Sequence, residues 1–226
     1  MKSLYLLLDL ATLFCPLLLS FDKNIRYVKS WKNAILSALI ISIPFIIWDI
    51  IFTQNGFWGF NPDYITGIYF YHLPIEEILF FIIVPFACTF IYECCKYFFR
   101  SYSFTYFNRV FSFFIPIYAM LLVFLDDVGY YTLLSIISSS IVLFWMMKNS
   151  HYRYIPIAFI FVLIPFFIVN GFLTGGFTQS PVVWYSDAQK VDHRIFTIPM
   201  EDILYNYALI VSNILVFEFL KKRLAK

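Results

Sequence analysis

The sequence predicts an all-α, polytopic membrane protein with seven transmembrane helices, and three observations support this fold class. The 226 residues are 62% hydrophobic and only 13% charged, with a mean hydropathy of +0.79, which is unlike an ordinary soluble domain. Seven segments approach the roughly 20 apolar residues that a span requires. A short motif with two adjacent acids also occurs twice, which predicts an internal repeat.

The seven predicted spans follow one another along a single membrane domain, 1–226. They cover residues 4–20, 34–53, 75–97, 107–125, 130–147, 155–174 and 199–220. The first span is short and follows Met1-Lys2, as in a signal peptide. Asp9 inside it and the lack of a small-x-small cleavage site favour a retained helix. Asp9 must then face the bundle or water, because a carboxylate facing lipid is costly.

The basic residues predict the orientation. Thirteen of the sixteen lie after the first, third and fifth spans or in the tail 221–226, and only Lys2, Lys190 and Arg194 lie on the other face. Positive charge is retained on the cytoplasmic side, so we expect an integral protein, typically of a bacterial inner membrane, with its N-terminus outside and its C-terminus in the cytoplasm. The net charge of +2 results from this asymmetry and does not indicate nucleic-acid binding. The four cysteines lack the spacing of a metal site.

The paired acids stand at the start of the third and the last span. Residues 74–81 read PIEEILFF and residues 199–206 read PMEDILYN. Proline suits the first turn of a helix, so each motif predicts a helix start with both acids in its first turn. One acid there can simply complement the helix dipole. Two acids, twice, at the border of an apolar span favour a functional site.

Other positions repeat in the same order as the motifs. Tyr131 matches Tyr5, Pro165 matches Pro44, and Asn170 matches Asp49. We therefore expect two three-helix repeats, 1–100 and 129–226, joined by a linking helix within 101–128. The third and seventh spans run in the same direction, which places both acid motifs at the outer face in a parallel repeat.

Four carboxyl groups in an aromatic-rich bundle are suited to proton transfer. Burial and neighbouring acids disfavour the ionised form, so some of these acids are expected to be protonated at neutral pH. A neutral acid can give a proton to an apolar substrate while a nearby carboxylate removes one, and aromatic faces stabilise the cation between the two steps. The sequence has no nucleotide, flavin or haem fingerprint, so no cofactor is predicted.

The two motifs, in their duplicated three-helix setting, resemble the membrane-integral lycopene cyclase family. That family occurs as two small subunits in some bacteria and as one fused chain in others and in fungi, and the resemblance covers essentially the whole chain. It implies an isomerase that closes the linear ends of lycopene, or of a related carotenoid, by acid catalysis through a carbocation and without redox change. Membrane lipid and other carotenoid-pathway enzymes are the implied partners. By motif match, the catalytic carboxyls are Glu76, Glu77, Glu201 and Asp202.

Adjacent acids on a helix point about 100° apart, so one acid of each pair should face the bundle. The pattern does not choose in the first motif, whereas Asn206 shares a helical face with Asp202 in the second. Because Glu holds the first position of both pairs, we expect Glu76 and Glu201 to transfer protons, with the second acids orienting them. The substrate-binding candidates near the motifs are Trp48, Asp49, Phe80, Asn170, Tyr205 and Asn206.

Three other classes of protein compete with this hypothesis. A retinal protein is disfavoured, because the last span has no lysine before Lys221. A prenyltransferase needs basic residues for a diphosphate, and the predicted outer loops have only Lys190 and Arg194. The sequence leaves open whether Arg194 pairs with a motif acid or with Asp192. The main alternative is a proton-coupled transporter or channel, although the acids cluster at one end and do not step across the bilayer. Its relay would use Asp9, Asp49, Glu76 and Glu201.

Overall fold

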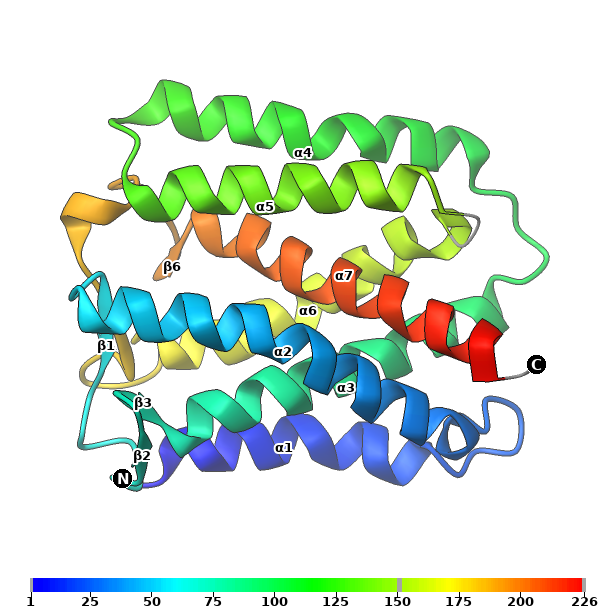
Figure 1. The fold of residues 1–226 in the computed structure, drawn as a ribbon, viewed down its shortest axis with the longest axis horizontal. Helices are drawn as coiled ribbons and strands as arrows, with labels where there is room; N and C mark the ends of the chain where they lie inside the picture. The colour runs from blue at the N-terminus through cyan, green and yellow to red at the C-terminus, as the bar shows by residue number, and fades with distance from the viewer. Residues whose placement is uncertain (1, 150–151, 225–226) are drawn as a thin grey trace.

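The computed structural model describes residues 2–149 and 152–224, which form seven roughly parallel and antiparallel helices (Figure 1). The helices are α1 (Leu4–Leu19), α2 (Trp31–Gln54), α3 (Ile75–Phe98), α4 (Thr105–Leu125), α5 (Tyr130–Met147), α6 (Ile155–Leu173) and α7 (Glu201–Leu224), with single turns of 3-10 helix at Tyr27–Ser30, Tyr152–Tyr154 and Asp187–Gln189. All seven expected helices are present, and no end differs from its expected position by more than four residues. Lys226, one of the basic residues counted for orientation, lies outside the described residues.

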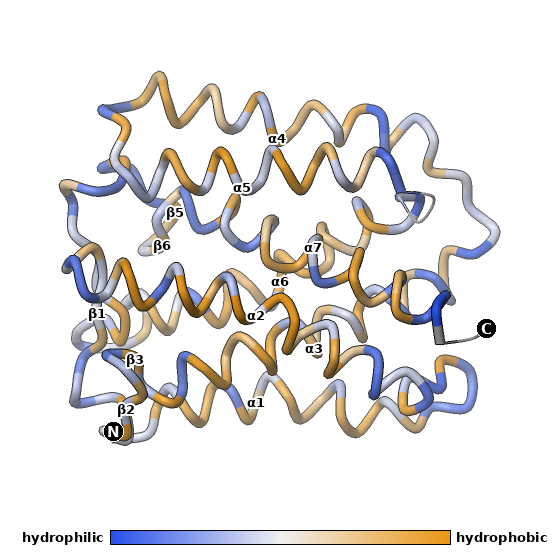
Figure 2. Tube along the Cα trace, viewed as in Figure 1, coloured by the Kyte–Doolittle hydropathy of each residue, from blue (hydrophilic) through white to orange (hydrophobic). Residues whose placement is uncertain are grey.

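The helices have the composition of a membrane protein. Six of them, α2 to α7, are long and apolar enough to cross a bilayer. Helix α1 is shorter, with 16 residues, or about 24 Å of helix against about 30 Å of hydrocarbon. Figure 2 shows hydrophobic residues along the helices and hydrophilic ones gathered at the two ends of the bundle. Large apolar side chains such as Phe14, Ile43 and Phe124 point outward, as expected of a surface that faces lipid.

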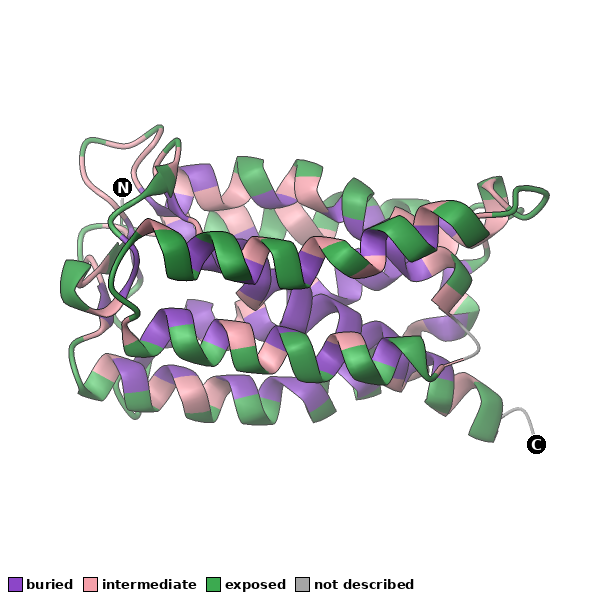
Figure 3. Cartoon of the chain, turned by 90° about the horizontal axis from the view of Figure 1, so that it is seen from above, coloured by how far each residue is buried: buried purple, intermediate pink, exposed green. Residues whose placement is uncertain are grey.

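Helix α7 forms the centre of the bundle and is the most buried of the six long helices (Figure 3). Helices α2, α3 and α5 pack directly against it. Its apolar side chains between the acids at one end and Glu218 at the other are almost all buried. Helix α4 packs on α5 at the edge of the bundle. Both acid pairs therefore stand on helices of the interior, where their positions are fixed by packing.

Polar contacts hold α3 and α7 together at two levels. In mid-helix, the side-chain amide of the buried Asn213 donates to Thr89 Oγ1 at 2.8 Å and to the Pro85 carbonyl at 3.2 Å. Near the C-terminal ends of both helices an ion cluster joins them, made of Glu93, Lys96, Glu218 and Lys221. These contacts fix the register of α3 on α7, and hence the relative positions of the two acid motifs.

Short strands cover the end of the bundle where α3 and α7 begin, which we call the motif end. Strand β1 (Trp58–Phe60) pairs with β4 (Val183–Tyr185), β2 (Tyr69–Phe70) with β3 (Leu73–Pro74), and β5 (Arg194–Ile195) with β6 (Ile198–Pro199), all antiparallel. Hairpins β2–β3 and β5–β6 lead directly into α3 and α7.

Each hairpin turn contains non-glycine residues with positive φ, namely Tyr71 and His72 in the first and Phe196 in the second. The sequence predicts Pro74 in the first turn of α3, but the structure places it at the N-cap position, just before the helix. Pro74 is still part of the hairpin there, where it pairs with Tyr69. Each pair of acids therefore follows a turn that fixes where its helix begins.

Candidate active site

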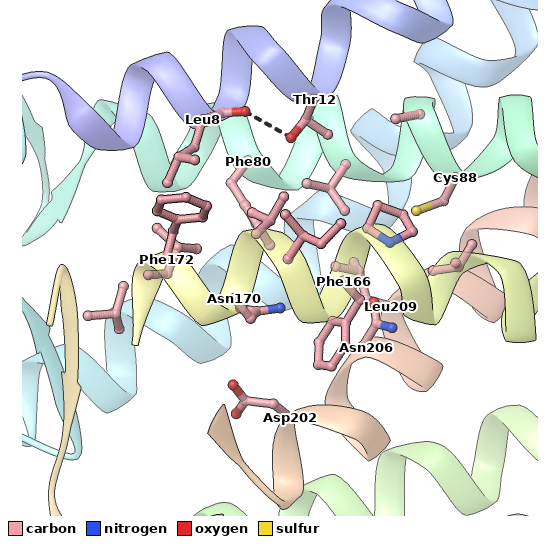
Figure 4. Close-up of a pocket in the computed structure, with 18 of the residues that line it drawn as sticks. Leu8, Thr12, Phe80, Cys88, Phe166, Asn170, Phe172, Asp202, Asn206 and Leu209 are labelled. Atoms are coloured by element: carbon pink, nitrogen blue, oxygen red, sulfur yellow. Dashed lines mark hydrogen bonds between the residues drawn. The ribbon is translucent and has the colours of Figure 1, made fainter. Parts of the chain in front are cut away.

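The second acid of each motif points into a shared cavity. Glu77 in the first turn of α3 and Asp202 in the first turn of α7 both line a cavity of about 560 Å³. Helices α1, α3, α6 and α7 supply most of its walls, which are mainly apolar (Figure 4). The two motifs thus contribute to one site, and this size lies within the range of cavities that bind small molecules.

Tyrosine hydroxyl groups bind both of these acids. Tyr5 in α1 donates to Glu77 Oε2 at 2.5 Å, and Tyr131 in α5 donates to Asp202 Oδ1 at 2.6 Å. Asp202 has a second donor, because Tyr185 in β4 reaches Oδ2 at 3.2 Å. Burial and the charge of Asp202 raise the pKa of Tyr185 well above its ordinary value, so this phenol remains a donor at neutral pH.

The first acid of each motif does not line the cavity. Glu76 and Glu201 are fully buried, and each accepts a hydrogen bond from a backbone N–H ten residues earlier in the chain. The Thr66 N–H lies 2.7 Å from Glu76 Oε1, and the Val191 N–H lies 2.6 Å from Glu201 Oε1. Thr132 in α5 donates to the same Glu201 oxygen at 2.6 Å. These acids therefore fix the preceding loops to the helix starts.

Five of the six predicted substrate-binding residues line the cavity: Asp49, Phe80, Asn170, Tyr205 and Asn206. Figure 4 shows Phe80, Asn170 and Asn206 around it, from three different helices. Asp49 accepts a hydrogen bond from Trp58 Nε1. Trp48 does not line the cavity, because its ring packs between α2 and α7, 4.9 Å from the ring centroid of Tyr205.

The structure also shows where Asp9 lies and which acid Arg194 pairs with, two points that the sequence left open. Asp9 is buried on the same face of α1 as Tyr5, but it does not line the cavity. Arg194 pairs with Asp187 at 3.7 Å and donates to the Thr197 carbonyl, so its ion pair involves neither Asp192 nor a motif acid. Asp187 also binds the buried ammonium group of Lys190 at 2.8 Å, which holds the pKa of the Asp187 carboxyl below its usual range.

Sequence reasoning missed most of the residues that hold the acids. Tyr5 and Tyr131 gave a signal, since they occupy matching positions at the starts of two helices. Tyr185, Thr132 and the Val191 amide gave none, because they reach the site only through the folding of the loops and of α5.

An all-helical membrane bundle with two buried acids on one apolar cavity defines a class of protein suited to act on an apolar molecule within a bilayer. The family model described as lycopene cyclase matches residues 2–95 and 128–220. The chain belongs to the lycopene cyclase family. The two matched stretches have similar lengths and lie on either side of α4. Neither the comparison with curated proteins nor the comparison with solved structures gives a match.

Proposed function

We propose that this protein is an acid-catalysed cyclase that closes the linear ends of lycopene, or of a related carotenoid, without exchanging electrons. Membership of the family supports a carotenoid substrate and cyclase activity. The observation that carries the chemistry is the approach of Glu77 and Asp202 to one apolar cavity, since a proton must be given to and taken from a hydrocarbon that supplies no acid of its own.

In the proposed reaction, a protonated Glu77 transfers its proton to the terminal double bond of the substrate. The resulting tertiary cation is attacked by the next reacting double bond, which forms the ring and moves the positive charge into it. The Asp202 carboxylate then removes a proton from a neighbouring carbon, and the electrons of that C–H bond form the new double bond. One proton enters and one leaves, so the product is an isomer of the substrate.

The hydrogen bonds support this division of roles. Two phenol donors on Asp202 favour its ionised form, as a base requires, whereas Glu77 has one phenol donor. The rings of Phe80 and Tyr205 on the cavity wall can stabilise the cation. This proposal exchanges the roles expected from the sequence, because Glu76 and Glu201 bind backbone amides and do not line the cavity.

Substitution of the acids tests the function and the roles together. In lycopene-accumulating cells, the wild-type chain should convert the pigment to cyclic products, and Glu77→Gln or Asp202→Asn should lower this conversion by about 10²-fold or more. Glu76→Gln and Glu201→Gln should lose less, because an amide oxygen still accepts the loop N–H. Full conversion by the Glu77→Gln, Asp202→Asn double variant, with normal membrane levels, would contradict the proposal.

We also propose that the domain consists of two parallel three-helix repeats, 1–100 and 129–226, linked by α4, with all seven helices in the bilayer, the N-terminus outside and the C-terminus in the cytoplasm. The matched family stretches and the equivalent hairpins support the repeat, and the basic residues support the orientation. In a background lacking native cysteines, a reagent added outside should label a cysteine at Asn61 and not one at Lys29. The reverse pattern would overturn the orientation.

A further inference from the structure

The cavity lies on one side of the bundle, and the matching side is filled. Three aromatic residues of α2, which we call the aromatic plug, occupy the space facing α7 and α5: Phe45, Trp48 and Phe52. The Phe45 and Trp48 rings lie 5.2 and 4.9 Å from the Tyr205 ring, measured between centroids. The Phe52 ring lies 6.3 Å from that of Tyr131 on α5. Side chains therefore close the side between α2 and α5.

Helix α6 has smaller residues where α2 carries two of these rings. When Asn170 is matched with Asp49, Val169 takes the place of Trp48 and Leu173 takes the place of Phe52. Both smaller residues line the cavity. An isopropyl group occupies less space than an indole, and Val169 lines the same cavity as Phe80, so the sequence of α6 favours an open side here.

The cavity reaches the outer surface of the bundle between α1 and α6. Ala11 and Cys15 on α1 line it and are exposed, and Ile168 on α6 lines it with 56% of its surface exposed. Matching Tyr5 with Tyr131 places the larger Ile137 and Ile141 of α5 where α1 has Ala11 and Cys15.

The opening faces lipid and leads to the acids. Ala11 lies about 10 Å along α1 from its first residue and is flanked by the exposed Leu10 and Phe14. The α3 wall of the cavity extends from Glu77 to Ile91, a rise of about 21 Å. The Thr12 hydroxyl, on the α1 wall, donates to the Leu8 carbonyl of its own helix and so is not directed into the cavity as a free donor (Figure 4). A long and mainly apolar space suits an extended hydrocarbon with one end at the acids.

We propose that the gap between α1 and α6 is a lateral doorway through which one end of a linear, apolar substrate passes from the bilayer to Glu77 and Asp202. The aromatic plug closes the matching gap, so each chain admits one substrate end at a time. The identity of the substrate rests on the proposed cyclase function, whereas the doorway rests on the shape of the cavity.

A reversible cross-link across the doorway tests this proposal. Cysteines at Ala11 and Ile168, in a chain lacking native cysteines and held in lipid vesicles, are joined by a short, thiol-cleavable cross-linker. Two readouts are followed: energy transfer from tryptophan, including the cavity residue Trp58, to a fluorescent linear tetraene dissolved in the bilayer, and cyclisation of lycopene. The control is a single cysteine at Ile164, which is 59% exposed and does not line the cavity, treated with the same reagent.

If the doorway is correct, cross-linking should slow both the entry of the tetraene and cyclisation by about tenfold or more. Cleavage of the cross-link should restore both rates, and the Ile164→Cys control should be unaffected. Unchanged tetraene entry in fully cross-linked protein would overturn the doorway. If cross-linking blocks tetraene entry while the untreated protein cyclises nothing, the doorway stands and the proposed function fails.

Discussion

Adjacent acids at the start of a helix must diverge, and both motifs use this divergence in the same way. The first acid turns towards the preceding loop and binds a backbone N–H, while the second turns into the cavity and binds a tyrosine. Their angular separation follows from helix geometry alone. Which acid turns inward depends on where the hairpin starts the helix, and this could not be predicted from the motif itself.

Tyr185 is the residue that distinguishes the two acids of the cavity. Tyr185 stands sixteen residues before Glu201, and the residue at the same spacing before Glu76 is Phe60, which has no hydroxyl group. Among the described residues, Asp202 therefore receives two phenol donors and Glu77 receives one. If the bond from Tyr185 holds Asp202 ready as the base, Tyr185→Phe should lower kcat by about tenfold and leave KM within about twofold, since the ring and its packing remain.

Steady-state cyclisation by purified protein in lipid vesicles measures both constants. Tyr130→Phe provides the matched control, because it removes the same hydroxyl from a tyrosine next to Tyr131 in α5 that is 63% exposed and does not line the cavity. A change in KM alone would show that the Tyr185 hydroxyl serves substrate binding and not the acid.

At the scale of elements, the difference between α2 and α6 decides where a substrate fits. Val169→Trp gives α6 the ring that α2 carries at the matching position, and this ring should fill the cavity beside Phe80. We expect cyclisation and tetraene binding to fall by about tenfold or more, because the space that holds the hydrocarbon is lost.

Ile164→Trp is the control for this substitution, since it adds the same ring on the same helix at an outward position away from the cavity. Equal activity of Val169→Trp and the wild type, at equal protein levels, would show that the substrate does not occupy this cavity.

The elements differed in how well the sequence predicted them. All seven helices were predicted from their apolar runs, and the starts of α3 and α7 also from the motif of proline followed by two acids. These signals are local in the sequence. The two hairpins were not predicted, since strands of two residues with Phe, Tyr and His at positive φ have no recognisable pattern. Burial of Glu76 and Glu201 against loop amides depends on those hairpins, so the motif alone points to Glu76 and Glu201 for proton transfer, whereas the roles we propose fall on Glu77 and Asp202.

At the scale of the whole molecule, the distribution of charge favours a cyclase over a proton-coupled transporter. The buried acids Asp9, Asp49, Glu77 and Asp202 lie at or near the motif end, in the first two turns of α1, α3 and α7 or the last two turns of α2. Near the opposite end, Glu93 and Glu218 are ion-paired with lysines. The long middle of α7 carries no acid between Asp202 and Glu218. A cavity with acids at one end and apolar walls fits chemistry on a hydrocarbon better than a relay across the bilayer.

In the reaction that we propose, ring closure begins with a proton from the protein and ends with the loss of another, without electron transfer. Incorporation of deuterium tests it most directly. Protein in lipid vesicles is equilibrated in D₂O, mixed with a limiting amount of lycopene for a single turnover without added flavin or nicotinamide, and the product is analysed by mass spectrometry. Acid-catalysed ring closure predicts one deuterium for each ring formed and no other change in mass. Ring formation without deuterium, or only when a redox cofactor is supplied, would contradict it.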